Sequence, residues 1–447
     1  MPDSDQSELK APVTSATVLR IAIPMTLAYL TTPIVGFVDT AAIGQLGSAA
    51  LIAAIAMGAI IFDFIFSTFN FLRAGTTGLV AQAYGAGNLP EQRNLFFRGI
   101  LLAVIPGLIV VLLREPILQA GIFLLGTSET VAPAVETYFS IRALSTPFAL
   151  VNYVILGWLI GMNRPGWALA LQILLNGVNA ILDGVFVLVL DWGVAGVGWG
   201  TVIAEVTAAT LGIAIVWQLM GRTWHISWPA ILNRHAFSRM ISVNTDIMIR
   251  TFCLMFAFAF FISQSQKYGD IPLAANSVLM QFFLIAGFLL DGLATSAEQL
   301  TGSSVGAGNR RRFTQAFWVS LAWNVAIATL CSAVFIVFGV AIVDFVTTSE
   351  PVRTTAYQYL PYAIATPVAG VLAFHLDGVF MGATWTKPLR NMMLGSVLIY
   401  LVSWQFLTPT WGNHGLWAAL LIFLAARGIT LGAMVPRMMR TSFSEPE

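Results

Sequence analysis

The chain has 447 residues, of which 57% are hydrophobic and only 10% are charged, and its mean hydropathy is +0.82. A soluble domain carries roughly a quarter charged residues, so this composition excludes a soluble globular protein. The formal net charge is only +1, and no basic patch interleaved with aromatic residues indicates a nucleic-acid partner.

Twelve apolar runs long enough to span a bilayer follow one another along the chain. A transmembrane helix needs about 20 mainly apolar residues, and open strands cannot satisfy their backbone groups in lipid. We therefore expect an all-α polytopic membrane protein with twelve transmembrane helices. The runs cover residues 18–43, 50–72, 95–114, 133–160, 167–190, 196–219, 239–264, 273–300, 314–339, 356–382, 389–408 and 414–437.

Lys and Arg alternate between the two sides of this arrangement. If the N-terminus is cytoplasmic, the inside segments hold most of them, including the run 310–312, whereas the outside segments hold Arg114, Lys267 and Arg353. Cytoplasmic loops are enriched in Lys and Arg, and a wrong number of spans would destroy this alternation. We expect both termini to be cytoplasmic.

Three motifs recur at one spacing, in the same order. Residues 85–88 read GAGN and recur as 306–309, Thr146-Pro147 recurs as Thr366-Pro367, and Trp192-Gly193 recurs as Trp411-Gly412, at spacings of 221, 220 and 219 residues. The Gly and Asn residues of GAGN suit the end of a helix. The chain is therefore expected to consist of two six-helix repeats.

An even number of spans in each repeat gives both repeats the same orientation, which makes them parallel repeats. We expect an N-terminal lobe over residues 1–219, a cytoplasmic linker over 220–240 that lies partly on the membrane surface, and a C-terminal lobe over 241–447. Two such lobes around a cleft are typical of transporters. No GxxxxGK[ST] motif for ATP binding is present, so we expect an ion gradient to supply the energy.

Polar residues inside the first six spans point to one pocket. Asn176, Asn179 and Asp183 share one helical face because they are spaced i, i+3 and i+7, and Thr201 follows the glycine-rich segment that opens the next span. Asp183 lies roughly 24 Å along its span and Asp39 roughly 32 Å along the first span, before any loss to tilt. The two carboxyl groups thus fall at similar depth in the outer half of the membrane.

Two carboxyl groups in a low-dielectric pocket can exchange a proton near neutral pH. We therefore interpret Asp39 and Asp183 as a cation-coupling site, with Asn179 and Thr201 as hydrogen-bonding partners. The alternative is a polar network that only holds helices together. For Asn176 the two readings are balanced.

The second six spans contain fewer clear candidates. Asp246 and Asp377 could bind an ion or a substrate, and a structural or gating role is open for Asp377. Arg73, Arg250 and Arg427 are expected to pair with acids or to reach the membrane surface. No catalytic constellation and no metal-ligand spacing is readable, so we expect neither an enzyme nor a cofactor.

Five segments resemble the multidrug and toxic compound extrusion (MATE) family, and its DinF-like branch in particular. Together they cover essentially the whole chain. They are GFVDTAAIGQLG in the first span, FLRAGTTGLVAQAYGAGN after the second, NGVNAILDGVFVL in the fifth, VAGVGWGT before the sixth and DGVFMGAT in the tenth.

This resemblance implies an antiporter that exports organic, often cationic or amphipathic, compounds in exchange for H⁺ or Na⁺. It implies that Asp39, Asp183, Asn179 and Thr201 form the cation site and that Pro24 is the point where the first helix bends. Asp377 matches an aspartate that another branch uses for Na⁺. That branch's glutamate in the seventh span has no clear counterpart here, and Asp246 is an uncertain substitute.

The reading we adopt is a proton-coupled multidrug antiporter of the bacterial inner membrane, acting as a monomer on small organic molecules. Na⁺ coupling is the first alternative. A flippase for a lipid-linked precursor is the second, although the few arginines inside the spans argue against a large pyrophosphate-binding cleft. A membrane-embedded enzyme and an ion channel are rival classes for which no motif is present.

Overall fold

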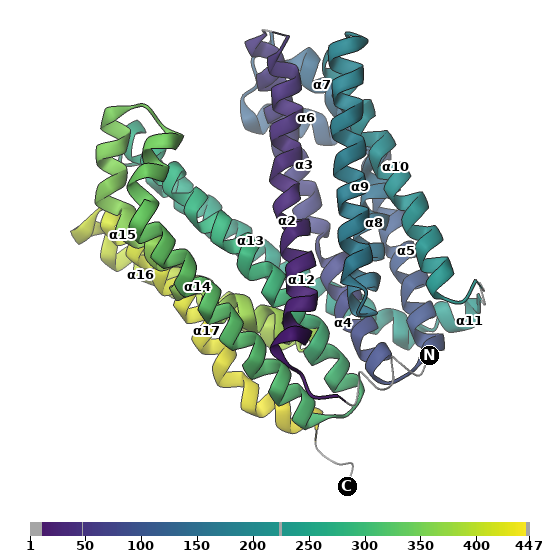
Figure 1. Cartoon of the computed structure of the whole chain (residues 1–447). Coiled ribbons are helices and arrows are strands. Elements are labelled where there is room, and N and C mark those ends of the chain that lie inside the picture. Colours follow the sequence, from purple (N-terminus) through teal and green to yellow (C-terminus); the bar gives the residue numbers. More distant parts are fainter. Residues whose placement is uncertain (1–10, 47, 223–225, 444–447) are drawn as a thin grey trace. The chain divides into compact units, whose positions relative to one another are not determined.

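The computed structural model describes residues 11–46, 48–222 and 226–443. These residues are almost entirely helical, and no strand occurs among them. Figure 1 shows the helices in chain order. They are α2 (Ser15–Gly44), α3 (Ala49–Phe69), α4 (Phe71–Gly85), α5 (Leu89–Leu112), α6 (Arg114–Leu125), α7 (Ala132–Arg142), α8 (Thr146–Gly161), α9 (Pro165–Asp183), α10 (Gly193–Leu219), α11 (Trp228–Ile231), α12 (Arg234–Gln266), α13 (Asp270–Gly306), α14 (Arg310–Val346), α15 (Glu350–Gly382), α16 (Thr386–Trp411) and α17 (Asn413–Ser442).

The helices confirm the predicted all-α membrane fold. Within the described ranges, eleven stretches are long and apolar enough to cross a membrane, and they coincide with the second to twelfth predicted spans. The first predicted span corresponds to the 30-residue helix α2, whose described apolar part is Ser15–Thr31. The short helices α6 and α11 were not predicted, because neither is long enough to register as a span.

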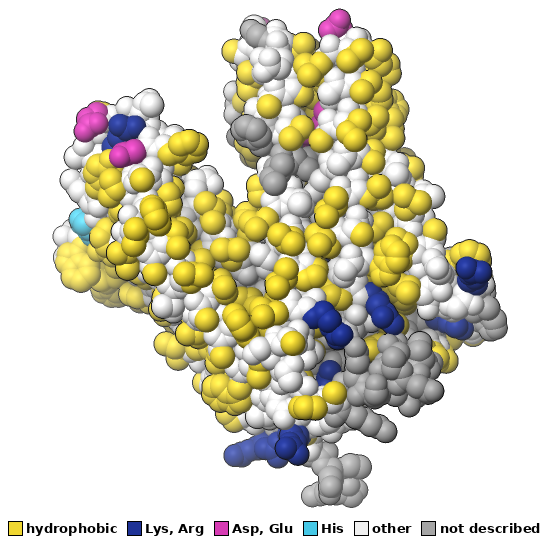
Figure 2. Space-filling model, viewed as in Figure 1, with side chains coloured by type: hydrophobic (Ala, Val, Ile, Leu, Met, Phe, Trp, Pro, Cys, Tyr) yellow, Lys and Arg dark blue, Asp and Glu magenta, His cyan; other side chains and the backbone are white. Residues whose placement is uncertain are grey.

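The outer surface has the character expected of a lipid-facing protein. Figure 2 shows hydrophobic side chains over the length of the helices, whereas most of the visible Lys and Arg side chains of each unit lie toward one end. Phe345, Phe123 and Leu112 are 92%, 84% and 80% exposed. Exposed apolar area on this scale would favour aggregation in water, so lipid is the solvent that fits it.

Contacts divide the chain into two compact units, which we call the N-terminal and C-terminal units. The C-terminal unit also takes up residues of α2 up to Thr26, and the N-terminal unit retains the segment that we had predicted to be a separate linker. The N-terminal unit consists of Leu27–Tyr84 and Asn88–Asn244, and the C-terminal unit of Met1–Thr26, Gly85–Gly87 and Thr245–Glu447.

The predicted linker over residues 220–240 is attached to the N-terminal unit by the buried Arg98 of α5. Its guanidinium group donates hydrogen bonds of 3.0 Å and 2.7 Å to the carbonyl oxygens of Ile231 and Ala230 in α11. These bonds satisfy backbone acceptors at the end of a very short helix. Residues 223–225 of the linker lie outside the described residues.

Both GAGN segments end a helix as predicted. Gly87 and Gly308 have φ angles of +65° and +62°, a left-handed conformation that favours glycine. The following asparagines have a role that was not predicted, since each caps the next helix. The side-chain oxygen of Asn88 accepts a 3.1 Å hydrogen bond from the backbone N–H of Glu91, and that of Asn309 accepts one of 2.9 Å from Arg312.

Candidate functional site

Asp39 of α2 and Asp183 of α9 lie next to each other in the N-terminal unit. Their side chains are 5% and 0% exposed, and the two carboxyl groups are within hydrogen-bonding reach of each other. In the described part of the chain neither forms an ion pair with Lys or Arg. Two adjacent buried carboxylates repel each other when both are charged, so the arrangement favours sharing a proton.

Asn179 connects this pair to α10. Its side-chain amide nitrogen lies 3.4 Å from Oδ1 of Asp183 and 3.4 Å from the hydroxyl oxygen of Thr201. The Thr201 hydroxyl donates to the carbonyl oxygen of Val197 at 3.1 Å, which leaves its oxygen free to accept from Asn179. The structure therefore brings together the four residues that the sequence predicts as a coupling site.

Asn176, which the sequence places on the same face of α9 as Asn179 and Asp183, stands apart from this group. Its side-chain oxygen accepts a 3.5 Å hydrogen bond from Gln172, and its side-chain nitrogen has no partner among the described residues. One turn of helix separates Asn176 from Asn179, so it lies on the same face of α9 but does not contact Asp183 or Thr201.

Helix α2 continues without a break through Pro24 and Pro33, the two prolines of the first span.

Asp183 is the last residue of α9, and a π-helix over Gly184–Val189 follows it directly. A wider helical turn of this kind is frequent at functional sites. It changes the direction of the side chains beyond Asp183 relative to a continuous α-helix. Sequence periodicity does not reveal such a turn, because the apolar pattern of GVFVLV fits either geometry.

Arg142 and Tyr138 of α7 are two neighbours of the site that the motif analysis did not single out. The Arg142 guanidinium donates a hydrogen bond to the Tyr138 hydroxyl and lies 4.7 Å from the ring centroid of Phe62. Arg142 also interacts electrostatically with Asp39 and Asp183. The available signal was the arginine itself, since a guanidinium inside a span requires a carboxylate or an aromatic partner.

Both acidic candidates of the C-terminal unit form ion pairs with arginines. Asp377 Oδ2 accepts hydrogen bonds from Arg427, at 2.6 Å, and from Arg250. Asp246 Oδ1 accepts from Arg390 at 2.7 Å, and its other oxygen accepts from Thr386 at 2.9 Å. The structure thus places Asp246 and Asp377 in separate ion pairs. Both Arg250 and Arg427 pair with an acid, as predicted.

A family model described as MatE matches residues 24–185 and again residues 247–403. The chain is also 34% identical over 428 residues to DNA damage-inducible protein F of Escherichia coli (strain K12), which covers 94% of this chain and 92% of that protein. The chain belongs to the MATE family. The predicted resemblance is therefore confirmed, and the two matched segments follow the two repeats.

Two further similarities extend over nearly the whole length of this MATE chain. The probable multidrug resistance protein NorM of Rhizobium meliloti (strain 1021) is 24% identical over 470 residues, covering 99% of this chain and 97% of that protein. A crystal structure described as MATE in complex with MaD5 superposes with a TM-score of 0.88 at 16% identity, covering 98% of each chain. The second similarity supports the fold alone.

No group of three or more His, Cys, Asp or Glu side chains that could hold a metal ion occurs in the described part of this MATE chain. Among the described residues His375 is the one buried histidine, and its ring centroid lies 5.0 Å from that of Phe317.

Proposed function

We propose that this MATE chain is a secondary antiporter that exports small organic compounds in exchange for protons. The observation that carries the proposal is the buried pair Asp39 and Asp183, which has a neutral amide and a hydroxyl beside it and forms no ion pair with a basic residue in the described part of the chain. A carboxyl pair held in this way can take up and release a proton without losing its other partners. The name of the NorM relative, a probable multidrug resistance protein, supports export of drug-like compounds.

Binding of a proton to Asp39 and Asp183 and binding of the organic compound would oppose each other. Protonation removes negative charge from the N-terminal unit and weakens its attraction for a cationic compound. Thermodynamic linkage requires each ligand to lower the affinity for the other by the same factor. Loading by protons from outside would then release the compound there.

Sodium coupling is the alternative that the same oxygens allow. Carboxylate, amide and hydroxyl oxygens are suitable ligands for a hard cation. Asp39 Oδ1, Asp183 Oδ2 and the Asn179 side-chain oxygen have no hydrogen-bond partner among the described residues. We favour the proton because two carboxyl groups within hydrogen-bonding reach of each other can share one proton with no further ligand.

The distribution of Lys and Arg along the chain supports the membrane placement that we propose. We place the protein in a bacterial inner membrane with both termini on the cytoplasmic side, because the basic residues gather in the segments that this orientation puts inside.

The decisive experiment is efflux of a cationic dye from proteoliposomes under a pH gradient or a Na⁺ gradient, each imposed separately. We expect the pH gradient alone to drive transport and the Asp39→Asn and Asp183→Asn variants to lose that coupling. Asp191→Asn is the matched control, because Asp191 is exposed and its φ of +54° suits asparagine. Transport driven by Na⁺ alone would overturn proton coupling, and full coupling in Asp39→Asn would overturn the site.

A further inference from the structure

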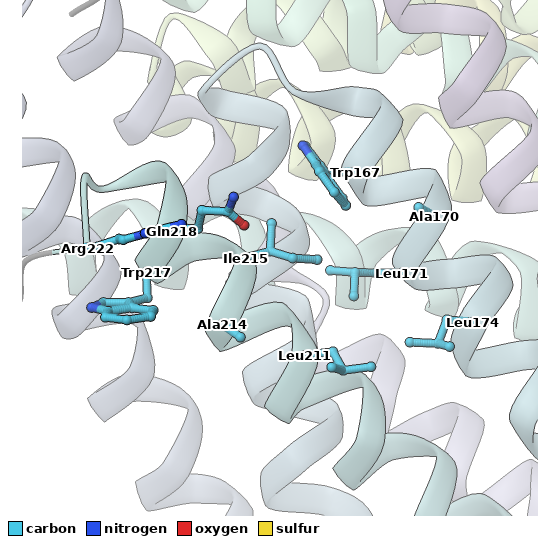
Figure 3. Close-up of a pocket in the computed structure, with 10 residues that line it drawn as sticks. All are labelled: Trp167, Ala170, Leu171, Leu174, Leu211, Ala214, Ile215, Trp217, Gln218 and Arg222. Carbon is cyan, nitrogen blue, oxygen red and sulfur yellow. The ribbon is translucent and has the colours of Figure 1, made fainter.

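A groove of about 580 Å³ lies between α9 and α10 of the N-terminal unit. Figure 3 shows its lining, in which Trp167 and Leu171 of α9 lie toward Ile215 of α10, and Trp217 of α10 lies close to Arg222. The other lining side chains are aliphatic except for two at one end, Gln218 and Arg222. None of these residues belongs to the carboxylate site.

Arg222 is a cation held at the mouth of this apolar groove. Its backbone N–H donates to the carbonyl oxygen of Trp217 at 3.0 Å, and its φ is +58°, a conformation that is uncommon outside glycine. The preceding Gly221 also has a positive φ, of +79°. The exposed Arg222 side chain makes no hydrogen bond or ion pair with the described residues. The turn therefore holds the backbone of Arg222 at the end of the groove and leaves its guanidinium group available.

The length of the groove matches one leaflet of a membrane. From Leu211 to Leu219, the end of α10, the helix advances about 12 Å at 1.5 Å per residue, and each leaflet contributes about half of the roughly 30 Å hydrocarbon core of a bilayer. Trp167 and Trp217 both lie at the Arg222 end, as tryptophans at a membrane interface do. The groove thus has an apolar part for an acyl chain and a basic end at headgroup level.

We propose that this groove binds one anionic phospholipid, with its phosphate at Arg222 and an acyl chain between α9 and α10. The single positive charge favours an anionic headgroup and disfavours a cationic drug. The two helices that form the groove also carry Asp183, Asn179 and Thr201. A bound lipid would therefore stabilise the packing of α9 against α10 and support the geometry of the carboxylate site.

The test is lipid binding by the purified full-length chain in mild detergent. Binding is measured by native mass spectrometry and by the shift in thermal unfolding. The additives are phosphatidylglycerol, phosphatidylcholine with the same acyl chains, and inorganic phosphate. We expect phosphatidylglycerol to bind about fivefold more tightly than phosphatidylcholine, the effect of one arginine near a headgroup. Inorganic phosphate should give no stabilisation, because it cannot fill the apolar part.

Two variants separate the two parts of the site. Arg222→Asn removes the charge while keeping a residue that tolerates positive φ, and it should lower phosphatidylglycerol affinity to that of phosphatidylcholine. Ala214→Trp fills the exposed groove and should weaken both lipids about equally. Arg234→Gln is the matched control, since this exposed arginine lies outside the groove and should change neither affinity.

Equal affinity for the two lipids in the unmodified protein would overturn the proposal. So would a preference for phosphatidylglycerol that survives in Arg222→Asn, or stabilisation by inorganic phosphate alone. Unfolding of each variant without added lipid shows whether it is folded. The binding measurement needs no transport activity, so its outcome is independent of the antiport proposal.

Discussion

A Cβ atom at Gly200 of α10 would lie 2.3 Å from Oδ1 of Asp183. This separation is far below a van der Waals contact, so α10 leaves room for the Asp183 carboxyl group only because residue 200 has no side chain. The backbone of Asp183 is farther away, at 3.5 Å for its nitrogen. A side chain at position 200 would therefore displace the carboxyl group and spare the helix packing.

Gly200→Ala is predicted to impair coupled transport with little loss of stability. The Asp183 side chain must rotate away from Asn179, and we expect proton-driven dye efflux to fall about tenfold, the equivalent of 1.4 kcal/mol. The midpoint of thermal unfolding in detergent should change by only a few degrees. Gly177→Ala on α9 is the control, because a Cβ atom there meets no atom within 4 Å. Equal transport by both variants would contradict the prediction.

Arg142→Gln is predicted to shift the dependence of transport on pH toward higher pH. Arg142 is a positive charge near Asp39 and Asp183, and it opposes their protonation. Without it the pair takes up its proton from a more alkaline medium. The measurement is the initial rate of dye efflux as a function of pH.

Two controls distinguish charge from packing at this position. Arg142→Lys keeps the charge but loses the fixed guanidinium plane over Phe62, so the pH profile should stay in place even where the rate falls. Arg114→Gln removes an exposed arginine at the start of α6 and should leave the pH profile and the efflux rate unchanged. A pH profile that is the same for Arg142→Gln and the unmodified protein would rule out an electrostatic role.

The fold could be predicted because long apolar runs and helix-ending motifs are clear in the sequence. A 20-residue apolar run has few structural solutions in lipid, and the GAGN segments mark helix ends through left-handed Gly87 and Gly308. Three of the four residues of the coupling site could be predicted from local pattern. Asn179 and Asp183 share the helical spacing of α9, and Thr201 follows the glycine-rich start of α10. Asp39 was identifiable as an isolated acid in an apolar span.

Other features depend on contacts between elements far apart in the chain, which spacing does not encode. The placement of Arg142 beside the carboxyl pair requires α7 to pack against α10, which in turn packs against α9. The pairing of Asp377 with both Arg250 and Arg427 requires three helices to meet. The π-helix after Asp183 leaves the hydrophobic pattern unchanged, so no periodicity could reveal it.

Asp377→Asn is predicted to destabilise the C-terminal unit. Arg427 is 2% exposed and Arg250 is 13% exposed, so the variant leaves two largely buried guanidinium groups without their carboxylate. Removing one partner of a buried pair typically costs about 3–5 kcal/mol. Thermal or denaturant unfolding of the purified protein measures the loss.

Asp246→Asn is the comparison for this ion pair. Its partner Arg390 is 30% exposed and can turn to solvent, so the expected loss is about 1 kcal/mol or less. The two variants remove the same charge from the same unit, and they differ in the burial of the arginine that remains. If both lower stability by the same amount, burial of the arginine is not the cause.

Glycine also sets the distance between α15 and α13 in the C-terminal unit. A Cβ atom at Gly382 would lie 1.9 Å from the carbonyl oxygen of Glu298, and one at Gly378 would lie 2.2 Å from that of Ala294. These neighbours are backbone atoms of α13, so they cannot rotate away as the Asp183 side chain can. Glycines four residues apart allow this close crossing of helices.

Gly382→Ala is therefore predicted to destabilise the protein, in contrast to Gly200→Ala. The added methyl group must push α15 away from α13, and overpacking of this kind costs about 1–3 kcal/mol or more. Gly395→Ala on α16 is the control, since its Cβ atom meets no atom within 4 Å. We expect a lower unfolding midpoint for Gly382→Ala alone. If Gly382→Ala unfolds at the same temperature as the control, α15 and α13 do not approach each other closely at Gly382.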